Sequence, residues 1–140
     1  MAHSVGRLIH DEGGSALAIE CDVADAAAVQ GLIDQTVAHF DGLDIVVHNA
    51  SSGLSGKAFK LAEINAADYD ERAGVAPGAA LLLARAAFPH LRDAGRGRFL
   101  VLNSSQGLHG GAMNPVYSAT KGAQRGFVKA LAREWGPYDI

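Results

Sequence analysis

Three short apolar runs separated by longer helical segments constrain the fold of this chain more than any other feature. The runs read ALAIECDV, LDIVVHN and RFLVLN and occupy residues 16–23, 43–49 and 98–103. Each is almost continuously apolar, without regular polar alternation, which is typical of strands that are covered on both faces. Such strands occur in parallel sheets whose neighbours are joined by helices. The pattern predicts an α/β fold: a doubly wound parallel sheet of three strands with flanking helices.

Helical signals fill the intervals between these strands. Residues 4–11 have the pattern of a helix end. Asp25 is a favourable helix N-cap, and apolar residues with a helical period follow it: Val29, Leu32, Ile33, Val37 and Phe40. A further helical segment spans residues 66–91, where Pro77 predicts a break or bend. The last helix is expected over residues 115–135, before a Gly-Pro pair that ends it.

Composition limits the kind of protein that this chain can be. With 140 residues, of which 49 % are apolar, it is expected to form a single domain, residues 1–140. A net charge of −3 without a basic block indicates no nucleic-acid partner, and the six histidines lack metal-ligand spacing, so no metal is expected. No apolar run approaches the roughly 20 residues of a membrane helix. The single cysteine, Cys21, fits a reducing compartment, so we expect a cytoplasmic protein that binds no membrane.

Tyr117 and Lys121 form the most informative pair in the sequence. They lie four residues apart in an expected helix and so share one face of it. A lysine ammonium near a phenol favours the phenolate, and a tyrosine tuned in this way can act as a general acid or base. Ser104 follows the third strand, where a hydroxyl can donate to a substrate carbonyl or oxyanion, while alternation directs Ser105 elsewhere. On spacing alone, these residues also fit an amphipathic helix and a turn.

Several motifs, in a fixed order, resemble those of the short-chain dehydrogenase/reductases. YSATKGA at residues 117–123 resembles the family's Y-x-A-S-K-x-A helix, and GRFLVLNSSQG at residues 97–107 resembles G-R-I-V-N-I-S-S-x-x-G. HNAS at residues 48–51 and CDVAD at residues 21–25 are similar to the N-N-A-G turn and the D-V-T-D stretch. Two shorter stretches also fit, namely FPHL from Phe88 and WGPY from Trp135. The resemblance covers essentially the whole chain.

The resemblance implies a partial Rossmann-like domain and hydride transfer between NAD or NADP and a small alcohol or ketone. Tyr117 would exchange the proton with the substrate oxygen, Lys121 would assist it and hold the nicotinamide ribose, and Ser104 would orient the carbonyl. The implied cofactor-binding residues are Asp22 and Val23 on the adenine side, Asn49 and Ala50 near the ribose, and Tyr117 with Lys121. The family also implies a homo-oligomer, with contacts through residues 81–83 and the Tyr117 helix.

The chain departs from the family pattern in three ways. His48 and Ser51 replace the first asparagine and the glycine of N-N-A-G. Ala76 replaces an asparagine that supports a water link to the lysine, so proton transfer would need another route or be slower. The glycine-rich T-G-x-x-x-G-x-G phosphate turn does not occur in the 140 residues, nor does the strand and lid that follow W-G-P-Y in the family. The sequence thus resembles an internal fragment of a longer family domain.

These departures leave two functions open and raise a packing problem. The chain is either an active oxidoreductase or a truncated, inactive homologue that acts as a fold fragment or interaction module. An in-frame upstream segment encoding the glycine-rich turn would favour the enzyme. In the strand order 3-2-1-4-5-6, residues 16–23 lack their neighbour. We expect a marginally stable chain, or docking of this run beside residues 43–49, with an incomplete cofactor cleft. Tight binding of a nicotinamide dinucleotide would contradict the incomplete cleft.

Overall fold

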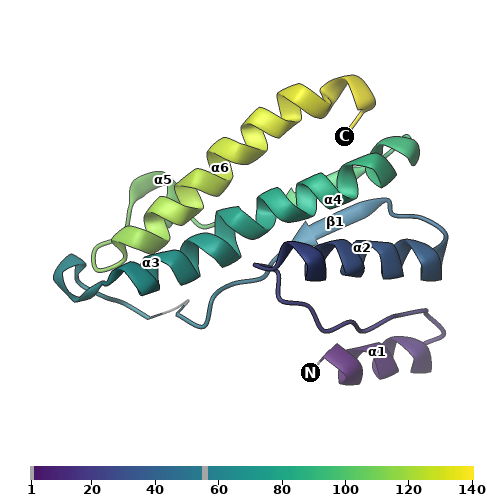
Figure 1. Ribbon diagram of the computed structural model, residues 1–140, viewed down its shortest axis with the longest axis horizontal. Helices are drawn as coiled ribbons and strands as arrows, with labels where there is room; N and C mark the ends of the chain where they lie inside the picture. Colours follow the sequence, from purple (N-terminus) through teal and green to yellow (C-terminus); the bar gives the residue numbers. More distant parts are fainter. Residues whose placement is uncertain (1, 55–56) are drawn as a thin grey trace.

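Helices cover one face of a small parallel sheet in the computed structural model, which describes residues 2–54 and 57–140 (Figure 1). In Figure 1 the long helices α4 and α6 run beside each other, α2 lies next to α4, and α1 is set apart near the N-terminus. The elements in chain order are α1 (Ala2–Asp11), α2 (Ala26–Phe40), β1 (Ile45–His48), η1 (Leu61–Glu63), α3 (Ala66–Ala73), η2 (Gly74–Gly78), α4 (Ala79–Asp93), β2 (Arg98–Val101), α5 (Gln106–His109), α6 (Pro115–Trp135) and η3 (Gly136–Tyr138).

The sheet consists of β1 and β2, which pair in parallel with residues 45–48 in register with residues 98–101. Two hydrogen bonds extend the ladder: Arg98 N–H donates to the Asp44 carbonyl at 2.8 Å, and Leu102 N–H donates to the His48 carbonyl at 3.0 Å. The connection between the strands runs through α3 and α4, as parallel neighbours require. The predicted α/β class is confirmed.

The prediction of a third strand at residues 16–23 is wrong, and so is its docking beside residues 43–49. This segment has no ladder partner in the described part of the chain and runs irregularly between α1 and α2 (Figure 1). A strand needs a neighbour to pair its backbone groups, and water serves those groups when no neighbour is present. Leu17 accordingly stays exposed, although the run is apolar enough to suggest a buried strand.

The helix boundaries follow local signals in the sequence. The Asp25 carboxylate accepts bonds from the backbone N–H groups of Ala27 (2.7 Å) and Ala28 (3.1 Å), so α2 starts at the predicted N-cap. The predicted last helix coincides with α6, and the predicted opening helix end coincides with α1. The sequence also predicts a Gly/Ser-rich loop at residues 51–57, directly after the second apolar run, and residues 55 and 56 of this loop lie outside the described residues. No described helix combines the length and apolar character needed to cross a bilayer.

Pro77 produces a π-helical turn, so the helical segment bends around residue 77 without ending. Proline has no N–H, and its ring crowds the carbonyl four residues earlier, so an α-helical turn is unfavourable here. A wider turn relieves both problems: Ala79 N–H donates to the carbonyl of Gly74, five residues earlier. The turn, η2, joins α3 to α4 and packs against α6.

The core lies between α2, α4, α6 and the covered face of the sheet. Its buried members are Ile33, Val46, Ala84, Ala87, Leu91 and Trp135. Phe88 of α4 stacks on Trp135 at the end of α6, with ring centroids 4.9 Å apart. The core therefore joins both long helices to the sheet, and it fixes the position of α6, on which the candidate catalytic pair lies.

Candidate active site

Tyr117 and Lys121 lie on α6 and line one small cavity, of about 10 Å³, at the carboxyl end of β1. Ala50 and Ser52 from the loop after β1 line the same cavity, as does Ala76 from the π turn. The full lining is Ala50, Ser51, Ser52, Arg72, Ala76, Tyr117, Thr120 and Lys121. In α/β sheets, ligands bind beyond the carboxyl ends of the strands. The cavity lies where such a site is expected.

Lys121 is a buried cation held by the end of β2. The residue is 7 % exposed, and Nζ donates to the Leu102 carbonyl at 2.9 Å. Nζ also lies 5.8 Å from the centre of the Tyr117 ring. Burial lowers the pKa of Lys121 below its ordinary value, because the charged form loses hydration. The ammonium is thus oriented beside the phenol, one helical turn away.

Ser104 is connected to α6 by hydrogen bonds of the neighbouring residue Asn103. Asn103 Nδ2 donates to the Lys121 carbonyl at 2.9 Å, and Ser104 N–H donates to Asn103 Oδ1 at 2.7 Å. The Ser104 hydroxyl accepts from Gln106 N–H at 3.2 Å, at the start of α5. Ser104 is half-buried, and it is not among the residues that line the small cavity with Tyr117. The hydroxyl therefore acts as a turn acceptor in this structure, next to the site.

The short helix α5 was not expected from the sequence, and it packs closely on α6. A Cβ added at Gly107 would lie 2.9 Å from Lys121 Cβ and 2.8 Å from its carbonyl carbon. Contacts below 3.0 Å force a shift of the backbone, so only glycine allows α5 to approach the Lys121 backbone this closely. Packing against Lys121 thus explains why glycine occupies position 107 in the strand-end motif, and the periodicity of the sequence does not show this.

The four remaining predicted cofactor residues lie at two places. Asn49 is exposed and Ala50 half-buried, directly after β1, and Ala50 lines the cavity with Tyr117. Asp22 is exposed, and its carboxylate accepts from Ala24 N–H at 2.9 Å, which shapes the turn that contains Val23. A Cβ built at Gly74 of the π turn would lie 3.7 Å from the Cβ of Ala24 in that turn, but neither Asp22 nor Val23 lines the cavity with Tyr117.

His48 is a feature of the site that sequence reasoning did not assign. The residue is 2 % exposed, and Nε2 lies 3.0 Å from the carbonyl oxygen of Ala76 in the π turn. Burial lowers the pKa of His48, and the charge of Lys121 lowers it further, while the bond to Ala76 raises it. His48 and Ala76 are both departures from the family pattern. Their joint departure was the only sequence signal that could have suggested this contact.

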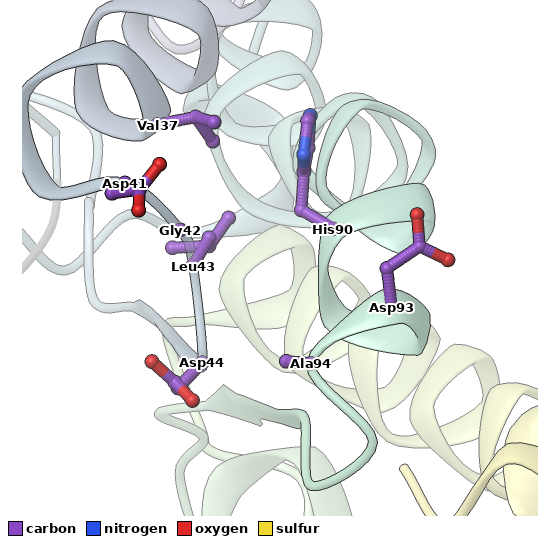
Figure 2. A pocket seen from close by; sticks show the side chains of 8 residues that line it. All are labelled: Val37, Asp41, Gly42, Leu43, Asp44, His90, Asp93 and Ala94. Carbon is purple, nitrogen blue, oxygen red and sulfur yellow. The ribbon is translucent and has the colours of Figure 1, made fainter.

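A larger cavity, of about 340 Å³, lies at the opposite end of the sheet, before the start of β1 (Figure 2). Asp41, Asp44 and Asp93 stand around its rim, and Figure 2 shows their carboxylates spread apart without a common focus. Arg96 pairs with Asp44 at 3.1 Å, and Arg92 with Asp93 at 2.7 Å. Across residues 2–54 and 57–140, no group of three or more acidic, histidine or cysteine side chains is placed to hold a metal ion. No tyrosine or lysine is among the residues that line this cavity, so it does not repeat the pair found at the carboxyl end of β1.

Comparison with known proteins now decides the family. A model of short chain dehydrogenases matches residues 2–140. The chain belongs to the short-chain dehydrogenase family. It is 34 % identical to a short chain dehydrogenase/reductase, AacuN, from Aspergillus aculeatus, over 99 % of this chain and 51 % of that protein. It is 36 % identical to versicolorin reductase stcU from Emericella nidulans, over 94 % of this chain and 48 % of that protein. This short-chain dehydrogenase sequence thus spans about half the length of the curated relatives it matches.

Solved structures agree with this family assignment. A metagenomic short-chain oxidoreductase in complex with NADP aligns with a TM-score of 0.88 and 28 % identity, covering 97 % of this chain and 61 % of its own. NAD⁺-bound xylitol dehydrogenase aligns with a TM-score of 0.92 and 22 % identity, covering 99 % of this chain and 53 % of its own. The second likeness shows the fold alone. The partial Rossmann-like architecture is therefore confirmed.

Proposed function

We propose that these residues form part of an NAD(P)-dependent oxidoreductase that transfers a hydride between the nicotinamide and a small alcohol or ketone. The observation that carries the proposal is the placement of Tyr117 and Lys121 on one face of α6, around one cavity at the carboxyl end of β1. Membership of the short-chain dehydrogenase family supports the reaction class. The NADP and NAD⁺ complexes of the two structural neighbours support the cofactor class.

Two features at the site offer hydrogen bonds to a nicotinamide dinucleotide. An ammonium has three N–H donors, and Lys121 gives one of them to Leu102, so two remain for ribose hydroxyls. The Ser52 hydroxyl lines the same cavity and is buried without a hydrogen-bond partner among the described residues. The proposed binding set is Asp22, Val23, Asn49, Ala50, Tyr117 and Lys121. The bound cofactor supplies or accepts the hydride, and the protein supplies position and proton transfer.

Tyr117 is proposed as the group that gives a proton to the ketone oxygen, or takes one from the alcohol. The neighbouring Lys121 ammonium stabilises the phenolate that remains after the proton has left. Ser104 is proposed to donate its hydroxyl hydrogen to the substrate oxygen, which polarises the carbonyl. In this structure the Ser104 hydroxyl accepts from Gln106 N–H, which leaves its own hydrogen free for that role.

The proposal is tested with Tyr117→Phe in the longest polypeptide that the gene of this chain encodes. Turnover of a panel of alcohols and ketones, followed by nicotinamide absorbance, is expected to fall by about 10²- to 10⁴-fold. Binding of NAD or NADP is expected to change little, because the ring remains. Tyr69→Phe, at an exposed tyrosine of α3, is the matched control and is expected to keep full turnover. Undiminished turnover in Tyr117→Phe would refute the role.

The alternative is a non-enzymatic fragment or interaction module. One face of the sheet supports it, since Ile45, Val47 and Leu100 are about half exposed and offer an apolar surface. A folded wild-type chain without turnover on any substrate would favour this alternative.

We also propose that the protein forms a homo-oligomer, as the family resemblance implies. Within the expected contact face, Leu81 is exposed and available, whereas Leu83 is buried inside the chain.

A further inference from the structure

His48, at the end of β1, contacts the π turn through its imidazole ring. A carbonyl oxygen can only accept, so the hydrogen between His48 Nε2 and the Ala76 oxygen belongs to the imidazole. The other ring nitrogen, Nδ1, is buried and has no partner in the part of the chain that the structure describes. A proton on Nδ1 would leave a buried, charged N–H without an acceptor, which is unfavourable. The geometry therefore requires the neutral ring, protonated at Nε2.

The π turn that His48 holds connects two sides of the proposed site. Ala76 itself lines the cavity with Tyr117 and Lys121, and η2 packs against α6. A methyl group built at Gly74 of the same turn would lie 3.7 Å from the Cβ of Ala24, in the turn that contains Asp22 and Val23. The wide turn created by Pro77 has fewer regular helical hydrogen bonds than an α-helix. A hydrogen-bond donor from outside the turn, here His48, therefore helps to hold its conformation.

We propose that His48, as the neutral Nε2–H tautomer, is a positioning residue that anchors the π turn to the end of β1 and so fixes both sides of the site. This inference rests on the proposed function for the identity of that site. It does not require His48 to contact cofactor or substrate. Its action passes through the Ala76 carbonyl, first to the cavity wall beside Lys121 and then, through Gly74, to the turn around Ala24.

The experiment is ¹⁵N NMR of the 140-residue chain without cofactor, at neutral pH. The His48 ring is expected to give the signature of the neutral tautomer with hydrogen on Nε2, with the exposed His39 as a reference in the same sample. The amide signals of Ala24 and Lys121 are then compared between wild type, His48→Gln and His48→Phe. Gln is expected to preserve both signals, because its amide places an N–H at a similar reach; Phe removes the donor and is expected to shift both.

His39→Phe, at the end of α2, is the matched control and is expected to leave both signals in place. The inference is overturned if the wild-type ring is protonated on both nitrogens or carries its hydrogen on Nδ1. It is also overturned if Gln and Phe move the two amides equally. Should His48→Phe fail to fold, the wild-type tautomer and the His48→Gln spectrum still decide the matter.

A dinucleotide titration separates this inference from the proposed function. If wild type binds NAD or NADP, His48→Phe is expected to bind about tenfold more weakly and His48→Gln to match wild type. Equal affinity of all three proteins contradicts the positioning role. If wild type binds neither dinucleotide, the binding proposal fails for this chain, and the amide signals still judge the contact between His48 and the π turn.

Discussion

Neighbouring residues of β1 face opposite environments, and the contrast explains where the site is built. Val46 and His48 are 7 % and 2 % exposed, whereas Ile45 and Val47 are 59 % and 56 % exposed. The covered face packs on α4 and carries the polar contact to the π turn. The open face leaves these apolar side chains about half exposed, and Leu100 of β2 shares this exposure. The candidate catalytic pair thus depends on one face of the sheet.

The sharpest way to break this contrast is to place the same charge on either face. Val46→Asp is expected to unfold the chain, because an unpaired buried carboxylate costs at least several kcal/mol, a large share of the stability of a small domain. Val47→Asp is expected to change stability by about 1 kcal/mol or less. Urea unfolding followed by circular dichroism measures both. Equal effects would show that the two faces do not differ in burial.

Removal of packing atoms from α4 sharpens the comparison on the helical side. Leu91→Ala is expected to cost about 2–5 kcal/mol, because Leu91 is fully buried in the core and leaves a cavity. Leu81→Ala is the control from the same helix, and its exposed side chain predicts a cost below about 1 kcal/mol. The difference in urea midpoint is the measurement. A smaller loss at Leu91 than at Leu81 would contradict the location of the core.

Two glycines test how tightly the site side is packed. Gly107→Ala is expected to cost about 1–3 kcal/mol, because the added methyl group meets the Lys121 backbone. Gly126→Ala, in the open middle of α6, meets nothing within 4 Å and is expected to stabilise the chain by about 0.5–1 kcal/mol. Thermal unfolding of the two variants shows whether each substitution lowers or raises the stability of the chain. Stabilisation by both substitutions would mean that α5 does not contact α6 as described.

The smallest expected effect is a pH dependence that arises on the covered face. The folded chain holds the pKa of His48 below its ordinary value of 6.5, mainly through burial and partly through the charge of Lys121 on α6. The turn η2, whose Ala76 carbonyl accepts the hydrogen bond from the ring, carries no titratable side chain. As pH falls through about 6.5, the unfolded chain therefore takes up a proton that the folded chain refuses, and stability decreases. His48→Gln is expected to weaken this decrease in urea midpoint. An unchanged pH profile would contradict the assignment.

Local signals were sufficient for the parts of the fold that depend on neighbouring residues. The adjacent sequence is enough to predict the N-cap at Asp25, and also the start of α6 at a proline and its end before a glycine. Both predictions are confirmed. The segment at residues 16–23 shows the limit of such signals. Its apolar run favours a strand, but a strand also needs a partner, and none of the described residues pairs with it. Tertiary context decided the outcome.

In the candidate site, too, local sequence predicts some features, and tertiary packing decides the others. Helical spacing alone predicts that Tyr117 and Lys121 share a face, and the structure agrees. Pro77 predicts a disturbed helix, although the choice of a π turn over a break depends on the packing of η2 against α6. The bond between His48 and Ala76 joins residues 28 apart in sequence, and no local pattern specifies such a partner. Only the two unusual residues indicated that these positions differ from the family.

The central claim, hydride transfer assisted by Tyr117, is tested most directly by isotope transfer. A ketone is reduced with a nicotinamide cofactor that carries deuterium at the transferable position, using the longest polypeptide that the gene encodes. The account predicts deuterium on the former carbonyl carbon with wild type, and formation of the labelled product about 10²- to 10⁴-fold more slowly with Tyr117→Phe. An unlabelled product from wild type, or equal rates of labelled product from both proteins, would contradict it.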